Sequence, residues 1–336
     1  MSATYRWDFS KLDKVIRFHP PDMILSVETG LAIHAVKDLV EAEQLWLPLD
    51  TPQNGHLPIA DFLAEDISLS WLSHHYGTAR DWVMKITAAD DQGHIVTSGA
   101  ALVKNVAGYM LAPLYVGAKH ALGPIVDVSF RLLPLPTDLR FVQWLGADLS
   151  IIQKILEITP DETTSLAFRN PWEGLRLEQK DGKWRLDAIT RASKDKIVAW
   201  AKNVGEGFPP TITEVAAPPR EYELGTIQPI LRIQVMPSRM SHFLAILPES
   251  VPSLVCYPAA GVIHIGAIDS TIDQHSLKIY LADVAASGGR IHALHEDGFP
   301  HVPADKAVTN DPMMMERVKD ILDPKGVFGP LPEYPW

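Results

Sequence analysis

Hydrophobic and polar positions near the start of the chain predict a strand followed by a helix. The stretch Met23–Glu28 is rich in large apolar residues and ends at Thr29-Gly30, which is typical of a strand closed by a tight turn. From Ala32 onward, apolar residues recur at three- and four-residue spacing until just before Leu45, and this period predicts an amphipathic helix. The run Leu45–Pro48 ends in proline and predicts an extended loop.

The next patterned segments predict antiparallel strands. The runs Trp82–Ala88 and His94–Thr97 flank Asp90–Gly93, whose glycine favours a turn, so the two runs are expected to pair as a hairpin. The run Ile125–Leu133 alternates between a largely polar and an apolar set of residues, which predicts a strand with one buried face. The two prolines of Leu133–Pro136 cannot continue a hydrogen-bonded ladder, so they predict an extended connector and a domain boundary.

The second half of the chain mixes short strand-like runs with helical patterns. This mixture is typical of an α+β domain built on an antiparallel sheet. A last helix is expected before Asp323–Gly326, where Pro and Gly end it. The strands are expected at Gly174–Glu178, Trp184–Ile189, Pro229–Val235 and Gly261–Ala267, and the helices at Leu149–Ile158, Lys194–Asn203 and Pro312–Leu322.

Composition narrows the classes of protein that fit these elements. The 336 residues, 46% hydrophobic and 21% charged, suffice for two cores, so two domains are expected. A net charge of −11, without any run of Lys or Arg, argues against a nucleic-acid partner. No apolar stretch approaches the roughly 20 residues that cross a bilayer, and the N-terminus does not resemble a signal peptide, which predicts a cytoplasmic protein. The single cysteine, Cys256, lies among apolar residues and is expected to be a buried structural thiol.

A glycine-punctuated segment in the first half carries the most specific pattern. It runs through Val103–Tyr109, then Leu114–Gly117, then Ala121–Ile125. Small residues at these points let the backbone approach a flat ligand closely, as bulkier side chains would prevent. Tight packing within the protein explains the same residues equally well, so the pattern alone leaves both interpretations open.

Several blocks along the chain resemble the FAD-linked oxidase family with the PCMH-type FAD-binding domain, the vanillyl-alcohol oxidase group. This family includes the D and E subunits of glycolate oxidase and D-lactate dehydrogenases, and the E subunit is the most similar. Softer matches to that subunit lie at Pro229–Pro237 and Ala286–Gly289. The blocks that carry the resemblance occur in the family's order and are Met23–Gly30, Leu47–Asp50, Tyr76–Asp81, Lys104–Tyr109, Arg131–Pro136 and Leu322–Phe328.

The resemblance implies an α+β chain with a truncated PCMH-type FAD-binding domain and a cap domain built on an antiparallel sheet. Residues 1–136 would form the partial FAD-binding domain and 137–310 the cap or substrate domain, while 311–336 would return to the first domain. The residues at the family's cofactor-binding positions are Pro48, Tyr76, Gly77, Arg80, Asp81, Lys104, Asn105, Val106, Ala107, Gly108, Tyr109, Gly117, Leu122, Gly123 and Ile125.

The sequence departs from the family at the two loops that hold the FAD pyrophosphate. Both loops use main-chain N–H groups at glycines, because a pyrophosphate needs converging donors. The earlier loop would precede the strand at Met23, where the sequence has no glycine, so we expect its half-domain to be missing. The later loop, Thr-Ile-Gly-Gly in the family, is Leu57–Ala60 here, and Pro58 has no N–H to donate.

Two further changes occur at positions that lie near the same FAD in the family. The family's Gly-Thr before Leu-Gly is His120-Ala121 here, and the Asp after Gly-Tyr is Met110. FAD is the cofactor that the family implies. Taken together, the changes predict that this chain does not hold FAD in the usual way.

Two residues of the second domain are candidate catalytic groups. Relatives in the family use sheet residues to face the substrate carboxylate and the flavin, and Arg232 and His264 lie in expected strands. Arginine suits a carboxylate and histidine takes a proton near neutral pH, although a structural role explains either residue as well. His292, His295 and Glu296 have a spacing that differs from that of zinc proteases, so no metal site is predicted.

Three functions remain compatible with the sequence. The leading one is a subunit of an FAD-linked 2-hydroxyacid oxidoreductase of the glycolate type, whose partners would be an intact FAD-binding subunit and an iron–sulfur subunit. Such a subunit would assist assembly or complete a site, and could lie at the inner membrane through its partners. The second is an active oxidoreductase with an altered or shared flavin site through Lys104–Gly108 and Gly123. The third is a stand-alone protein that binds another small molecule.

Overall fold

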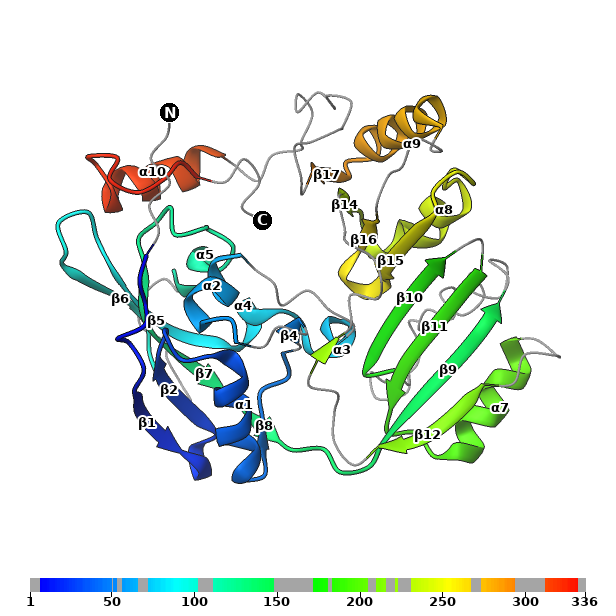
Figure 1. Cartoon of the computed structure of the whole chain (residues 1–336), viewed down its shortest axis with the longest axis horizontal. Coiled ribbons are helices and arrows are strands. Elements are labelled where there is room, and N and C mark those ends of the chain that lie inside the picture. The colour runs from blue at the N-terminus through cyan, green and yellow to red at the C-terminus, as the bar shows by residue number, and fades with distance from the viewer. Residues whose placement is uncertain are drawn as a thin grey trace, which may run out of the picture. The chain divides into compact units, whose positions relative to one another are not determined.

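The computed structural model describes residues 7–49, 51–52, 56–65, 72–101, 111–147, 172–180, 183–204, 210–215, 221–222, 231–266, 273–293 and 312–331. The chain divides into two compact units (Figure 1). Unit 1 comprises Met1–Leu69, Gly77–Pro136 and Thr309–Trp336. Unit 2 comprises Ser70–Tyr76 and Thr137–Val308, so a short stretch before Gly77 packs with the second unit.

Unit 1 is built, among its described residues, on a five-stranded antiparallel sheet in the order β1-β2-β7-β5-β6 (Figure 1). The predicted first strand is confirmed as β2, and the predicted hairpin as β5 and β6. The edge strand β1 was not predicted, because it is mostly exposed and has no alternating apolar pattern. The bounds are Val15–His19 for β1, Ile24–Glu28 for β2, Ile125–Arg131 for β7, Val83–Ala89 for β5 and Ile95–Gly99 for β6.

The burial of side chains along β7 differs from the predicted pattern. Alternation predicted one polar and one apolar face, but Ser129 is 0% exposed and Ile125 is buried as well. The Ser129 hydroxyl is satisfied by that of Ser26 on β2, at 2.7 Å. Ser26 and Ser129 are both buried, so each hydroxyl needs a partner, and they satisfy each other.

Short helices and strands complete unit 1. The predicted helix after Gly30 is confirmed as α1, and the C-terminal one as α10. The proline run after β7 was expected to interrupt pairing, yet its first two residues pair with Leu45–Trp46; proline is tolerated at such a short strand. The bounds are Ile33–Ala42 for α1, Ile59–Ala64 for α2, Ala79–Trp82 for α4, Ala112–Tyr115 for α5, Pro312–Leu322 for α10, Pro20–Asp22 for η1, Leu45–Trp46 for β3, Thr51–Pro52 for β4 and Leu133–Pro134 for β8.

Unit 2 contains, within the described ranges, an eight-stranded antiparallel sheet in the order β12-β9-β11-β10-β15-β16-β14-β17. The four predicted strands are confirmed as β10, β11, β14 and β16. The helix expected at Leu149–Ile158 lies outside the described residues. The bounds are Leu139–Ala147 for β9, Gly174–Lys180 for β10, Lys183–Thr190 for β11, Thr211–Val215 for β12, Glu221–Tyr222 for β13, Leu231–Gln234 for β14, Ser253–Tyr257 for β15, Val262–Ile265 for β16 and Arg290–Ala293 for β17.

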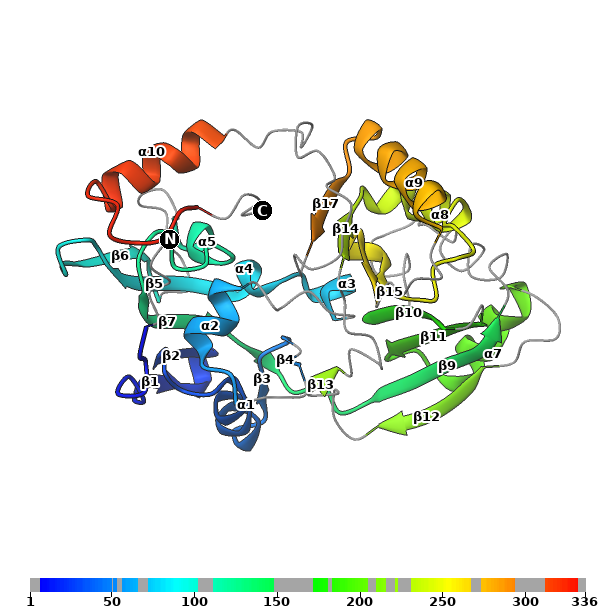
Figure 2. The same cartoon turned by 45° about the horizontal axis from the view of Figure 1, so that its top comes forward.

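One face of the unit 2 sheet is apolar and is covered by helices α7, α8 and α9 (Figures 1 and 2). These helices span Lys194–Val204, Met240–Ala245 and Gln274–Ala286, and Ser73–Tyr76 forms the further helix α3. The core between them contains Cys256, which is 0% exposed, so the predicted buried thiol is confirmed. Burial raises the pKa of that thiol. The opposite face, referred to below as the polar face, carries Arg176, Asp187, Arg232 and His264 beside buried apolar residues such as Val255.

The α+β fold class is confirmed by this combination of helices and antiparallel sheets. The remaining short turns of unit 2 are the 3-10 helices η3, Pro237–Arg239, and η4, Pro258–Ala260. Within the described segments, the helix with the most residues is α9, with 13, and no helix there combines the length and the apolar character that a membrane crossing needs.

Candidate functional site

The residues at the family's cofactor positions fall into three groups. Lys104, Asn105, Val106, Ala107, Gly108 and Tyr109, with Met110, lie outside the described residues. Unit 1 holds Pro48, Gly77, Arg80, Asp81, Gly117, Leu122, Gly123 and Ile125, whereas unit 2 holds Tyr76 and the catalytic candidates Arg232 and His264.

The residues of the Tyr76–Asp81 block organise a turn and the start of a helix. Gly77 has a φ of 77°, and a Cβ there would lie 2.2 Å from the Asp81 carboxylate. Thr78 and Asp81 form a capping box at the start of α4, in which the Thr78 N–H donates to Asp81 Oδ2 at 2.8 Å. Arg80 donates to the carbonyl of Val116 at 2.9 Å, next to Gly117. These contacts give Gly77–Asp81 a structural role within unit 1.

Tyr76 is engaged by charged residues of unit 2. Its hydroxyl donates to Glu173 Oε2 at 2.5 Å and accepts from Arg191 Nη2 at 3.2 Å. Arg191 and Glu173 also form an ion pair at 2.8 Å. Burial, reinforced by the hydrogen bond and the charge of Glu173, raises the pKa of the Tyr76 phenol. The three side chains therefore fix α3 to unit 2.

The loop Leu57–Ala60, at the position of the family's second pyrophosphate loop, is joined to the segment after β2 by main-chain hydrogen bonds. The N–H of Ile59 donates to the carbonyl of Leu31 at 2.9 Å, and that of Ala60 to Thr29 at 2.9 Å. The N–H of Ile33 donates back to Leu57 at 3.1 Å. Ile59 and Ala60 are both 0% exposed. We refer to Leu57–Ala60 together with His120 as the second-loop site.

The main-chain donors of the neighbouring segment are engaged in the same way. Gly117 and Lys119 donate to the end of α2, while Ala121 and Gly123 close turns within the segment. The distances are 2.8 Å from Gly117 N to Leu63 O, 3.0 Å from Lys119 N to Ala64 O, 2.8 Å from Ala121 N to Ala118 O and 3.0 Å from Gly123 N to His120 O. A pyrophosphate requires donors that point at it, whereas these donors point at carbonyls of unit 1.

His120 fills space at the second-loop site. It has a φ of 61°, in the left-handed region that favours glycine, the residue that the family has at this position. Its imidazole is 13% exposed, lies 5.3 Å from the Phe9 ring centroid, and places Nε2 3.6 Å from Asp61 Oδ1. Burial lowers the pKa of His120, against the opposing charges of Asp61 and Glu65. A buried imidazole beside two carboxylates does not fit an FAD pyrophosphate.

The polar face of the unit 2 sheet brings Arg232 and His264 together. They are opposite each other in the register of β14 and β16, and this row continues through Val255 to Glu178. The Nδ1 atom of His264 is buried and has no hydrogen-bond partner among the described residues, and its ring contacts the Tyr257 ring edge-on at 5.8 Å. Burial and then the Arg232 charge lower the pKa of His264 to about 3.

The neighbouring row of the same face is a charged network around Asp187. This carboxylate, 1% exposed, accepts from Arg176 at 2.6 Å, Arg185 at 2.9 Å and Gln143 at 2.8 Å. Arg176 is 7% exposed. This network was not predicted from the sequence, although its charged residues alternate with apolar ones in the predicted strands β10 and β11. The contacts of Phe9 and Asp61 with His120 were not predicted either, because no local pattern links these residues.

No group of three or more His, Cys, Asp or Glu side chains within the described ranges is placed to hold a metal ion. Of the histidine cluster considered above, His292 lies in β17, opposite Arg232 in register. His295 and Glu296 lie outside the described residues.

The lowered pKa of His264 predicts a pH-dependent stability for unit 2. Because the folded state lowers its pKa from 6.5 to about 3, the neutral imidazole is favoured in the fold and stability is lost as the pH falls below 6.5. From linkage, the free energy of unfolding should be about 2 kcal/mol smaller at pH 5 than at pH 7 on this account. Urea denaturation of His264→Gln should show a correspondingly weaker pH dependence, and His56→Gln, at an exposed histidine of unit 1, is the control for loss of an imidazole elsewhere. Equal slopes for His264→Gln and the wild type would contradict the assignment.

Comparison with curated proteins gives partial matches to 2-hydroxyacid oxidoreductases, while no family model matches the chain. The chain is 24% identical over 160 residues to a D-2-hydroxyglutarate dehydrogenase of Stutzerimonas stutzeri, covering 48% of this chain and 34% of that protein. It is 27% identical over 128 residues to the glycolate oxidase subunit GlcD of Bacillus subtilis, covering 38% and 27%. It is 24% identical over 173 residues to the glycolate oxidase subunit GlcE of Escherichia coli K12, covering 50% and 49%. The matches thus span about half or less of these relatives.

Solved structures extend the similarity to the whole fold. The xylooligosaccharide oxidase of Myceliophthora thermophila C1, solved with xylobiose, superposes with a TM-score of 0.63 over 96% of this chain and 80% of that one, at 13% identity. At that identity the likeness concerns the fold alone. Together with the sequence matches, it supports the resemblance of the chain to FAD-linked oxidases of the PCMH type, the glycolate oxidase E subunit among them.

Proposed function

We propose that the chain is a subunit of an FAD-linked 2-hydroxyacid oxidoreductase complex of the glycolate type and does not itself hold FAD in the family's manner. The observation that carries the proposal is the engagement of the donors at the second-loop site. The N–H groups of Ile59 and Ala60 donate to main-chain carbonyls of the segment after β2. Binding a pyrophosphate there would first require these hydrogen bonds to break.

The charge at the second-loop site supports the same proposal. Asp61 lies in the first turn of α2, where its carboxylate is already the anion that a helix start favours. Glu65 pairs with Lys119 at 3.8 Å. An incoming diphosphate would meet two carboxylates and, in His120, an imidazole whose lowered pKa favours the neutral form.

The partners proposed for this subunit are an intact FAD-binding subunit and an iron–sulfur subunit. The similarity to both the GlcD and the GlcE subunits of glycolate oxidase supports an assembly of unlike chains. The edge strand β1 offers one surface for such a partner, since Val15 is 45% and Ile16 52% exposed on it. An exposed edge with apolar side chains pairs readily with another strand.

The polar face of unit 2 is the place where this subunit would complete a site. Arg232 carries the charge and the paired donors that suit the carboxylate of a 2-hydroxyacid. The neighbouring His264, with a pKa of about 3, stays neutral at physiological pH and can accept or donate a hydrogen bond there. Catalytic roles for Arg232 and His264 are part of this proposal.

The visible absorption spectrum of the purified chain tests the proposal. The chain expressed alone should be colourless, and it should copurify with flavin only when expressed with an intact FAD-binding subunit of the glycolate oxidase type. Stoichiometric FAD on the chain alone would refute the proposal and favour an active oxidoreductase with an altered flavin site. A colourless chain that forms no complex with such a subunit would also refute it, and would favour a stand-alone binding protein.

A further inference from the structure

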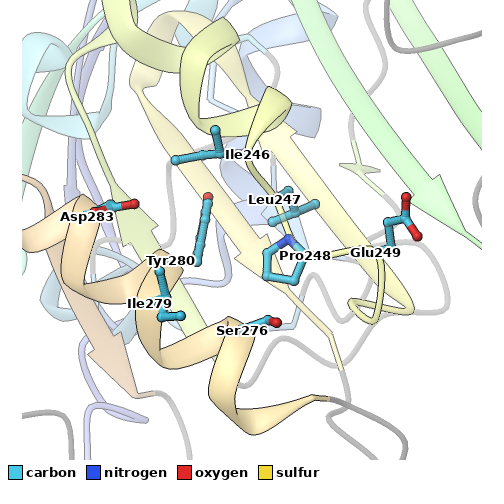
Figure 3. A pocket seen from close by; sticks show the side chains of 8 residues that line it. All are labelled: Ile246, Leu247, Pro248, Glu249, Ser276, Ile279, Tyr280 and Asp283. Atoms are coloured by element: carbon cyan, nitrogen blue, oxygen red, sulfur yellow. The ribbon is translucent and has the colours of Figure 1, made fainter.

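A groove lies on the helical side of unit 2, away from the polar face that carries Arg232 and His264 (Figure 3). Its volume is about 400 Å³. The turn after α8 forms one wall and one side of α9 forms the other. The lining residues are Ile246, Leu247, Pro248, Glu249, Ser276, Ile279, Tyr280 and Asp283.

The groove exposes more apolar surface than a helix layer over a sheet requires. Ile246 is 39% exposed and Ile279 is 53% exposed. Helix α9 already buries Leu277, Tyr280, Leu281 and Val284 against the sheet, so Ile279 extends its apolar surface beyond the core-facing side. Single exposed apolar residues are common, but two isoleucines that line one groove are typical of a contact surface.

Tyr280 gives the groove a polar group that lacks a partner. Its side chain is 2% exposed, and its hydroxyl is buried without a hydrogen bond to any described residue. Figure 3 shows the ring extending from α9 toward the turn that carries Ile246, with its hydroxyl end on that side. The ring packs edge-on against Phe243 at 6.4 Å. Because a buried hydroxyl without a partner is unfavourable, an acceptor that reached it from the groove would gain a hydrogen bond there.

The charge of the groove selects its occupant. Glu249 and Asp283 are both exposed, and none of the eight lining residues is Lys, Arg or His. A complementary occupant therefore combines an aliphatic body with a positive charge.

We infer that this groove docks a segment of a partner protein that presents a large aliphatic side chain beside a Lys or Arg. The aliphatic side chain lies between Ile246 and Ile279, and the cation meets Asp283 or Glu249. A main-chain carbonyl of the segment accepts from Tyr280. The inference goes beyond the proposed function and is independent of flavin binding, because it concerns the opposite side of unit 2.

Selection from a random peptide library displayed on phage, against the full chain, tests the inference. Enriched peptides should combine an aliphatic residue with a nearby Lys or Arg. Their affinity, measured by fluorescence polarisation, should fall about tenfold or more for Ile279→Glu, as for the loss of a central apolar contact. The double variant Glu249→Gln with Asp283→Asn, and separately Tyr280→Phe, should each weaken binding about threefold or more.

The matched control is Val198→Glu on α7, which places the same charge at another exposed apolar position, 38% exposed, and should leave binding unchanged. Unchanged thermal melts would show that each variant folds. The inference is overturned if no peptide is enriched, if enriched peptides lack the aliphatic and basic pair, or if Ile279→Glu leaves binding intact. Self-association of the chain that Ile279→Glu abolishes would also overturn it, in favour of a second copy as the occupant.

Discussion

Replacing Asp187 with Asn is expected to destabilise unit 2 by about 3 kcal/mol, in the range for breaking a buried ion pair from one side. The carboxylate is 1% exposed and accepts from Arg176 at 2.6 Å. The amide keeps the shape of the side chain but removes the charge that compensates the buried guanidinium of Arg176. The free energy of unfolding, from urea denaturation followed by tryptophan fluorescence, would report the loss.

The control for Asp187→Asn is a substitution of Arg185, the other arginine that contacts this carboxylate. Arg185 contacts the same carboxylate at 2.9 Å, but its side chain is 40% exposed, so water can replace the contact. Arg185→Gln should therefore cost at most about 1 kcal/mol. If both variants lost the same free energy of unfolding, burial of the Asp187–Arg176 ion pair would not explain the effect of Asp187→Asn.

Replacing Gly123 with Ala is expected to destabilise unit 1 by about 3 kcal/mol or more, through a forbidden backbone conformation and a steric clash. Gly123 has a φ of 113°, and a Cβ there would lie 2.1 Å from the carbonyl oxygen of Ala89. Since that oxygen belongs to the backbone, the strand must move to make room. The same denaturation measurement, made without any flavin, would assign this glycine of the family's cofactor segment a structural role.

Gly93→Ala separates the two contributions at Gly123. Gly93 has a φ of 81°, yet no atom lies within 4 Å of the position its Cβ would take. Gly93→Ala should therefore lower the free energy of unfolding only by the strain of a left-handed alanine, about 1–2 kcal/mol. A Gly123→Ala variant as stable as Gly93→Ala would contradict the predicted clash.

The predictable part of the fold follows from strong periodicity. Strands β10 and β11 alternate over seven and eight residues and α1 keeps its helical period, so all three were found. The edge strands β1 and β12 are largely exposed and therefore lack a buried stripe. Strand β15 is apolar at nearly every position, and such a run does not distinguish a strand from a buried helix.

Predicting the candidate site required a resemblance to a known family. The contacts within the site join residues far apart in the chain, so no local sequence pattern reveals them. The loss of glycine at Ile59 is visible in the sequence, but its hydrogen bond to Leu31 depends on residues far apart in the chain. The left-handed conformation of His120 is not visible in the sequence either, because residues other than glycine seldom adopt it. The cross-strand partnership of Arg232 and His264 required the register of the sheet.

The pairing of Leu57–Ala60 with the segment after β2 bears on how a pyrophosphate loop of the family's type could be designed into this chain. Exchanging side chains for glycine would leave the hydrogen bonds of Ile59 and Ala60 in place, because they join main-chain atoms. A pyrophosphate site would require Leu57–Ala60 to move away from the segment after β2. Each intermediate sequence would be less stable without yet binding a ligand. On the proposed function, single substitutions at this loop are therefore not expected to create a flavin site.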